Sequence, residues 1–224
     1  MNNIIVAENV TKWYKIGNVY ALNKINLSIA ENTTTAIIGK SGCGKTTLLN
    51  ILGGLDFPTD GKVYILGEEI TNLKETKLSK IRANNLGFVF QFYNLIPELT
   101  AYQNILFPLA VSKKEIDEKY IKSIMTLIGI NSFSDRLPAQ LSGGQQQRVA
   151  IARALAHKPS IILMDEPTGN LDEENSNRIC ELIKNLHKEL NQTILYVTHD
   201  MDMAKSADRI IKLKDGVFVD EDKQ

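Results

Sequence analysis

The sequence predicts an α/β protein built around a parallel sheet, and three observations support this fold class. An apolar run at residues 36–38 leads into a glycine-rich loop and then into apolar residues at helical spacing. A second apolar run, residues 161–164, ends in two acidic residues, as a parallel strand covered on both faces does. Between them, residues 92–159 have mainly helical character, which indicates a helical insertion.

The N-terminal residues, up to position 38, are expected to form strands. Polar turns separate three strand-like stretches, residues 4–10, 20–29 and 33–38. Trp13 and Tyr14 close the first of them. Because neighbours on a strand face opposite ways, one of these two aromatic residues can face a ligand while the other packs or meets solvent.

The region after the glycine-rich loop alternates between strands and helices. A turn at residues 57–61 precedes a short strand at 62–66, and a polar helix is expected over 74–83. Residues 86–90 then form an apolar strand that ends in Gln91. A buried strand with one polar side chain at its tip is how open sheets place site residues.

The helical insertion carries one amphipathic stripe, formed by Ile116, Tyr120, Ile121, Ile124, Leu127 and Ile128. We expect a single domain, with residues 1–91 and 160–224 as its core and residues 92–159 as the inserted helical part. The remaining elements expected in the core are a helix at 173–190 and strands at 193–197, 209–213 and 217–219.

Composition limits the function classes. The 224 residues include 26 basic and 26 acidic ones, so no net charge attracts the chain to nucleic acid or to an anionic membrane. No apolar run approaches the roughly 20 residues of a membrane span, and a signal-peptide layout is missing, so we expect a cytoplasmic protein unless a partner holds it at a membrane. Cys43 and Cys180 give neither a metal-binding spacing nor a disulfide framework.

Residues 39–47 fit the pattern G-x-x-x-x-G-K-[ST] of a phosphate-binding loop, in the required context between strand and helix. Backbone N–H groups of such a loop and the positive end of the following helix cradle an anion. Lys45 is expected to reach the β- and γ-phosphates, and the Thr46 hydroxyl to bind Mg²⁺. A nucleotide is the default ligand, held by Gly39, Lys40, Ser41, Gly42, Cys43, Gly44, Lys45, Thr46 and Thr47.

Two acidic residues complete the hydrolytic chemistry. Asp165 ends an apolar strand, where NTPases with this loop place the acid that holds Mg²⁺. Glu166 follows immediately and is placed to orient or deprotonate the water that attacks the γ-phosphate.

A second glycine-containing turn opens a helix at Leu141-Ser-Gly-Gly-Gln145, so it is a second anion site by the same physics. Here the chain resembles the ATP-binding cassette (ABC) ATPases, whose signature is LSGGQ. The resemblance implies a P-loop NTPase (RecA-like) core with an antiparallel β subdomain and an inserted α-helical subdomain. It also implies a head-to-tail homodimer, in which Ser142, Gly143, Gly144 and Gln145 act in trans on ATP bound at Lys45.

The resemblance assigns further roles. Gln91 matches the glutamine that touches Mg²⁺ and the attacking water, and residues 91–104 match the segment that contacts a membrane permease. His199 matches the switch histidine on the γ-phosphate, and Tyr14 matches the aromatic residue that stacks on adenine. Residues 169–172, Gly-Asn-Leu-Asp, depart from the common Ser-Ala-Leu-Asp, which puts in doubt any contact that needs the serine hydroxyl.

The finer resemblance is to the lipoprotein-release and macrolide-exporter class, which also includes antimicrobial-peptide transporters and the cell-division cassette. It is carried by residues 87–97, 99–100, 141–154 and 165–172. It implies a Mg²⁺-dependent, ATP-hydrolysing subunit that drives a separate permease from the cytoplasmic face of the membrane, with no nucleic-acid partner.

The alternatives are a soluble ABC ATPase acting on ribosomes or DNA, a regulatory cell-division cassette, and a P-loop GTPase or kinase. One further hypothesis is that Cys43, if exposed in the empty loop, reacts with maleimide and is protected by ATP.

Overall fold

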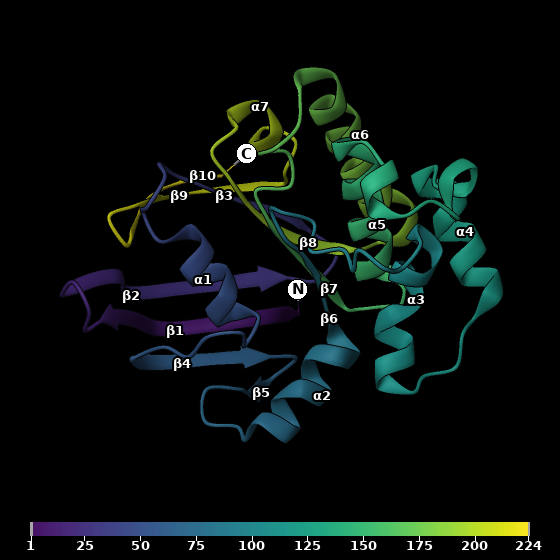
Figure 1. The fold of residues 1–224 in the computed structure, drawn as a ribbon. Helices are drawn as coiled ribbons and strands as arrows, with labels where there is room; N and C mark the ends of the chain where they lie inside the picture. The colour runs from purple at the N-terminus through teal and green to yellow at the C-terminus, as the bar shows by residue number, and fades with distance from the viewer. Residues whose placement is uncertain (1, 224) are drawn as a thin grey trace.

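The computed structural model describes residues 2–223 and contains two sheets and a helical arm (Figure 1). The first sheet is antiparallel, in the strand order β2-β1-β4-β5. Its strands are β1 (Asn3–Tyr14), β2 (Val19–Ala30), β4 (Asp60–Ile65) and β5 (Glu68–Glu69). Alternation of buried and exposed residues along β2 matches a sheet with one face on the core.

The second sheet has six strands in the order β10-β9-β3-β8-β7-β6. All neighbouring pairs are parallel except the antiparallel pair of β9 and β10. The strands are β3 (Thr34–Ile38), β6 (Leu86–Val89), β7 (Ile161–Asp165), β8 (Thr193–Thr198), β9 (Arg209–Lys214) and β10 (Val217–Lys223). Every residue of β3 and β8 is buried, which explains the apolar runs at residues 36–38 and 194–197.

Helix α1 (Lys45–Leu52) packs between the two sheets, in contact with β7 and β8 on one side and with β1 and β2 on the other (Figure 1). Its Leu48 and Leu52 are fully buried in a core that includes Ile5 of β1 and Leu163 of β7. This packing fixes the loop that joins β3 to α1 at the carboxyl end of the parallel strands.

Most of the remaining helices gather at one side of the parallel sheet and form the helical arm, whereas the helix at residues 75–85 packs on β6 (Figure 1). A second core joins this arm to β7 and β8 through residues such as Ile105, Ile124, Ile151 and Ile162. The helices are α2 (Glu75–Asn85), α3 (Ala101–Ser112), α4 (Glu118–Ile128), α5 (Gly143–Leu155), α6 (Glu173–Leu190) and α7 (Met201–Ala204), with short 3₁₀ turns at η1 (Asn131–Phe133) and η2 (Pro138–Gln140). None of the helices in residues 2–223 has the length and apolar character needed to cross a bilayer.

The fold class predicted from the sequence is confirmed. The short elements β5 and α7 were not predicted, and other differences lie at element ends. Strand β1 extends beyond the predicted stretch 4–10 because its pairing with β2 continues through Trp13 and Tyr14, which close the strand as expected. The inclusion of Ile116 in the amphipathic stripe is wrong. The side chain of Asp117 accepts a hydrogen bond from the backbone N–H of Tyr120 and so caps α4, which leaves Ile116 outside the helix and 45% exposed.

Candidate active site

The phosphate-binding loop leaves the buried end of β3 and enters α1 at Lys45. Gly42 and Gly44 have φ values of +79° and +106°, in the left-handed region that glycine adopts without strain. A Cβ atom at Gly44 would lie 2.3 Å from the carbonyl oxygen of Ala21, so no side chain fits at this position. The loop therefore needs these glycines to direct its backbone around the start of the helix.

A cleft of about 590 Å³ lies at this end of the sheet. It brings together many of the residues predicted from the sequence, although they come from distant parts of the chain. Val19 and Ala21 also line it and were not predicted, although Val19 pairs directly with Tyr14 across the β1–β2 hairpin. The predicted residues at the cleft are Tyr14, Ser41, Gly42, Gly44, Lys45, Thr46, Thr47, Gln91, Glu166 and His199.

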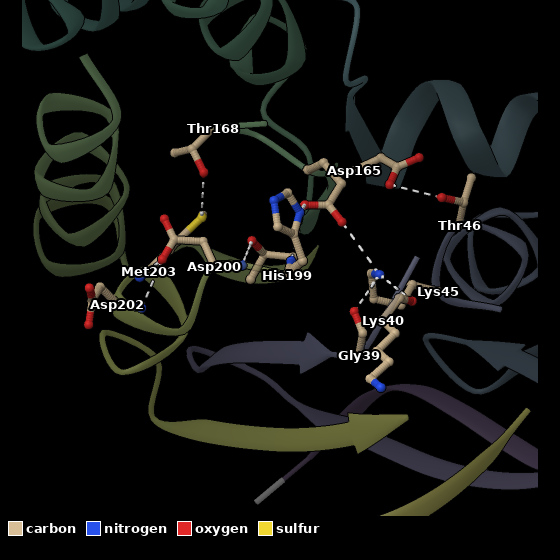
Figure 2. A network of polar contacts seen from close by, with 12 residues as sticks. Gly39, Lys40, Lys45, Thr46, Asp165, Thr168, His199, Asp200, Asp202 and Met203 are labelled. Atoms are coloured by element: carbon tan, nitrogen blue, oxygen red, sulfur yellow. Dashed lines mark hydrogen bonds and ion pairs between the residues drawn. The ribbon is translucent and has the colours of Figure 1, made fainter. Parts of the chain in front are cut away.

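The ammonium group of Lys45 is buried at the centre of the loop (Figure 2). It donates hydrogen bonds to the carbonyl oxygens of Gly39 at 2.8 Å and Lys40 at 3.1 Å. Its Nζ also lies 3.5 Å from Glu166 Oε1. A buried cation held by backbone carbonyls is suited to an anionic ligand in the cleft.

Thr46 and Asp165 meet across the loop, where the Thr46 hydroxyl donates to Asp165 Oδ1 at 3.1 Å (Figure 2). Burial raises the pKa of Asp165, while the Thr46 hydrogen bond opposes the rise. A hydroxyl, a carboxylate and the nearby Gln91 amide are oxygen donors of the kind Mg²⁺ prefers, and Mg²⁺ commonly binds through one or two carboxylates together with phosphates and water. Residues 2–223 contain no cluster of three or more His, Cys, Asp or Glu side chains that could hold a metal.

Glu166 is joined to His199 by two contacts to one carboxylate oxygen. Glu166 Oε2 accepts from the backbone N–H of His199 at 3.2 Å and lies 2.8 Å from its ring Nδ1. Glu166 has a φ of +45°, a left-handed conformation that is uncommon outside glycine and concentrated at functional sites. The backbone conformation and the contacts to His199 direct the carboxylate into the cleft.

Cys43 lies on the core side of the loop. Its side chain is buried in the cluster around α1, and its sulfur sits so close to Gly39 that a Cβ there would come within 2.6 Å of it. Cys43, Gly39 and Lys40 were predicted to hold the nucleotide but are not among the described residues that line the cleft. The backbone carbonyls of Gly39 and Lys40 accept hydrogen bonds from Lys45 instead. The exposure on which the maleimide hypothesis depends is therefore not found.

The signature residues lie at the start of α5, outside the described lining of the cleft. Ser142 caps the helix: its hydroxyl accepts from the backbone N–H of Gln145 at 3.3 Å, and the Gln145 side chain accepts from the Ser142 N–H at 3.0 Å. Gly144 is packed so closely on α6 that a Cβ would lie 2.7 Å from Asn175 Oδ1, and Gly143 lies beside the Tyr93 hydroxyl. One chain thus carries two glycine-containing helix starts, and the one at Ser142 is not among the described residues that line the cleft.

Asn170 belongs to the Gly-Asn-Leu-Asp stretch at residues 169–172, which differs from the common Ser-Ala-Leu-Asp, and it makes a contact that was not predicted from the sequence. The Asn170 side-chain N–H donates to the backbone carbonyl of Gln91 at 2.7 Å, so it ties the segment after β7 to the segment after β6. Asp172 caps α6 by accepting from the Asn175 N–H at 2.8 Å.

Comparison with known proteins identifies the family. The family model described as ABC transporter matches residues 22–169. The chain is 47% identical to the ABC transporter ATP-binding protein MJ0796 of Methanocaldococcus jannaschii, covering 98% of this chain and 97% of that protein. A solved structure described as a dimeric post-hydrolysis state of the MJ0796 cassette bound to ADP and Pi superposes with a TM-score of 0.88 at 44% identity, covering 98% of each chain.

Two other relatives have names that indicate transport roles. The lipoprotein-releasing system ATP-binding protein LolD of Francisella tularensis is 43% identical over 96% of each chain. The macrolide export ATP-binding/permease protein MacB of Chlorobaculum tepidum is 44% identical over 96% of this chain, which spans 34% of that protein. The chain belongs to the ABC transporter family. Within this family it is an ATP-binding cassette with ATPase function.

Proposed function

We propose that two copies of this chain associate head to tail, enclose ATP and Mg²⁺ between them, and use hydrolysis to drive a separate membrane permease. The proposal rests mainly on one observation: the helix starts at Lys45 and at Ser142, both of the type that binds anions, do not line the same cleft within one chain. The cleft holds Lys45, Glu166 and His199, whereas the capped helix end at Ser142 lies elsewhere. The MJ0796 cassette, which this chain resembles, has a solved structure described as dimeric and bound to ADP and Pi, and this supports the association of two copies.

Hydrolysis in this site rests on positioning and electrostatic stabilisation. Lys45 neutralises charge on the transferred phosphoryl group, and the partner copy's signature helix supplies N–H groups from the other side. Glu166 orients or deprotonates the attacking water, and the Glu166–His199 contact holds both side chains toward the γ-phosphate. Tyr14 stacks on adenine at the far end of the cleft.

Mg²⁺ is proposed to be held by Thr46, Asp165 and Gln91 together with phosphate oxygens and water. It would neutralise charge that develops on the β- and γ-phosphate oxygens. The protein's own part is to keep the Thr46 hydroxyl and the Asp165 carboxylate together, 3.1 Å apart, at the start of α1.

The permease is proposed to dock beside residues 91–104, where an apolar groove of about 440 Å³ lies between α2, β6, α3 and α5. Phe92, next to Gln91, is highly exposed, and Phe107 and Val111 of α3 are exposed at the groove. The name of the MacB relative joins an ATP-binding part to a permease in one protein. The groove's apolar lining includes Leu55, Phe88, Phe90, Phe107, Pro108 and Val111.

Asn104, at the end of the predicted contact segment, has a different role. Its side chain is completely buried and accepts from the Ile96 N–H while donating to the carbonyls of Ile96, Leu99 and Thr100. We infer that Asn104 holds the segment in shape and that the exposed residues before it meet the permease.

We propose an exporter or extractor of lipoprotein, antimicrobial-peptide or macrolide type, held at the cytoplasmic face of the membrane by its permease. The names of LolD and MacB support the lipoprotein and macrolide types. We also propose that the working units are the core of residues 1–91 and 160–224, which includes the β subdomain, and the helical subdomain of residues 92–159.

The test is the dependence of ATP turnover on protein concentration, without any permease. If two copies build each site, turnover per chain falls as the protein is diluted below its self-association constant. Turnover per chain that stays constant over such a dilution would overturn the dimeric mechanism.

A further inference from the structure

Two charged side chains, Lys12 and Asp56, contact Tyr14 and are not among the described residues that line the nucleotide cleft. The Tyr14 hydroxyl donates to Asp56 Oδ2 at 3.2 Å. Lys12 Nζ donates to Asp56 Oδ1 at 2.7 Å and to the carbonyl oxygen of Phe57 at 2.7 Å. The same ammonium lies 5.1 Å from the centroid of the Tyr14 ring, a distance at which a cation is attracted to an aromatic face.

The positions of these residues follow from the fold. Lys12 and Tyr14 are two apart on β1, so their side chains share one face of the strand. Asp56 lies just beyond α1, the helix that begins with Lys45. The Lys12–Asp56 pair therefore connects the strand that carries Tyr14 to the end of the helix that opens the phosphate site.

The cluster is sheltered enough to hold a fixed geometry. The Lys12 side chain is only 14% exposed. Burial alone would raise the pKa of Asp56, but the hydrogen bonds from Lys12, the Phe57 N–H and Tyr14 hold it below its usual value. Asp56 is thus an anion at neutral pH and accepts from both neighbours.

Tyr14 has one side left for a ligand. Tyr14 is 40% exposed and lines the cleft beside Val19 and Ala21, whereas Lys12 and Asp56 are not among the described residues that line it. The Lys12 ammonium lies over the ring without lining the cleft, so a planar base can reach the part of the ring that the cleft exposes.

We infer that Lys12 and Asp56 are positioning residues that hold Tyr14 in the orientation needed to stack on the base of the nucleotide. Asp56 holds the hydroxyl end of the ring by a hydrogen bond. Lys12 holds Asp56 by an ion pair and also attracts the face of the ring above which its ammonium group lies. Without them the ring is free to leave its stacking orientation, and only the binding energy that comes from the base is lost. The inference rests on the proposed stacking role of Tyr14.

The chain contains a matched arrangement far from the cleft. Lys158 Nζ lies 4.8 Å from the centroid of the Tyr120 ring and forms an ion pair of 2.8 Å with Asp117. Lys158→Met removes the same type of cation from the same type of ring, but none of these residues is among the described residues at the cleft. It is therefore the control for general effects of losing such a contact.

The experiment compares ATP with inorganic triphosphate, which has the phosphates but no base. Dissociation constants are measured by titration calorimetry with Mg²⁺ for the full chain and for Lys12→Met, Asp56→Asn, Tyr14→Ala and Lys158→Met. We expect Lys12→Met and Asp56→Asn to weaken ATP binding by about three- to tenfold, or about 0.7–1.4 kcal/mol, and to leave triphosphate binding unchanged. In ATPase assays KM should rise with kcat unchanged, Lys12→Arg should restore KM, and Lys158→Met should behave as the unaltered chain.

The outcomes separate this inference from the proposed function. If Tyr14→Ala leaves the preference for ATP over triphosphate unchanged, the stacking role of Tyr14 is wrong and the inference falls with it. If Tyr14→Ala weakens ATP selectively but Lys12→Met and Asp56→Asn do not, only the positioning role is wrong. Equal weakening of both ligands by Lys12→Met and Asp56→Asn also contradicts it, because it indicates a loss unrelated to the base.

Discussion

Glu166 Oε2 lies 2.8 Å from His199 Nδ1, and it also accepts the His199 backbone N–H. The two residues come from the ends of β7 and β8, which pair as neighbours in the parallel sheet. Because parallel strands present their carboxyl ends at one edge, the sheet brings together residues that are 33 positions apart in the chain. The contact orients the carboxylate that we propose as the catalytic base.

Glu166→Gln should bind ATP but hydrolyse it about 10²–10⁴-fold more slowly, because an amide cannot accept the proton of the attacking water. ATP should therefore accumulate in a closed dimer. Steady-state ATPase assays and size-exclusion chromatography with ATP measure the two effects. Glu189→Gln, at an exposed position near the end of α6, is the control and should retain activity. Rapid turnover by Glu166→Gln would show that another group is the base.

Mixing two inactive variants tests whether the signature helix acts on the partner's ATP. Ser142→Arg blocks the helix end, and Lys45→Ala removes the cation of the phosphate loop, so each alone should lose activity. In a mixed dimer, one site combines intact Lys45 of one chain with intact Ser142 of the other. Hydrolysis should return in proportion to the fraction of mixed dimers.

A control for this experiment is the double variant that carries both changes in one chain. Mixed with the unaltered chain, it leaves each site of the mixed dimer with one defect if the sites are shared. If each chain instead completes its own site, the site of the unaltered chain should keep full activity in every mixed dimer.

Asn104→Ala should lower the free energy of unfolding by about 2–4 kcal/mol, because it leaves several buried backbone groups without their partner. Urea unfolding followed by circular dichroism measures the loss. Asn131→Ala removes one exposed hydrogen bond to Thr126 and should stay within about 0.5 kcal/mol of the unaltered chain. A loss as small for Asn104→Ala as for Asn131→Ala would contradict the bracing role of Asn104.

Both cysteines should react slowly with maleimide in the folded protein at neutral pH, with or without ATP. Cys43 is buried behind the loop, so the reagent cannot reach it. Burial raises the pKa of the Cys180 thiol to about 11, so little Cys180 thiolate is present at neutral pH. Labelling rates measured by mass spectrometry, with the urea-unfolded chain as reference, check this. Fast labelling of Cys43 that ATP suppresses would show that the loop opens.

Several features were predictable because they depend on local chemistry. The phosphate loop needs glycines at fixed positions, and the strands leading to Gly39 and Asp165 are continuous apolar runs since both faces are covered. Helix ends were less predictable. A single side chain, Asp117, decides where α4 begins, and the periodicity of its neighbours extends past it to Ile116.

The sequence alone identified this chain as an ATP-binding cassette, because Lys45, Asp165, Glu166 and the turn at Ser142 belong to short patterns defined by residue type and spacing. Only the tertiary structure decided which of them meet: β7 and β8 join Glu166 to His199, while the signature helix stays apart from the cleft. It also decided the hidden contacts, such as Lys12 with Asp56 behind Tyr14 and Asn170 with Gln91. The reason is physical, since these contacts join residues that are distant in the chain and that only the packing of sheets and helices brings within hydrogen-bond distance.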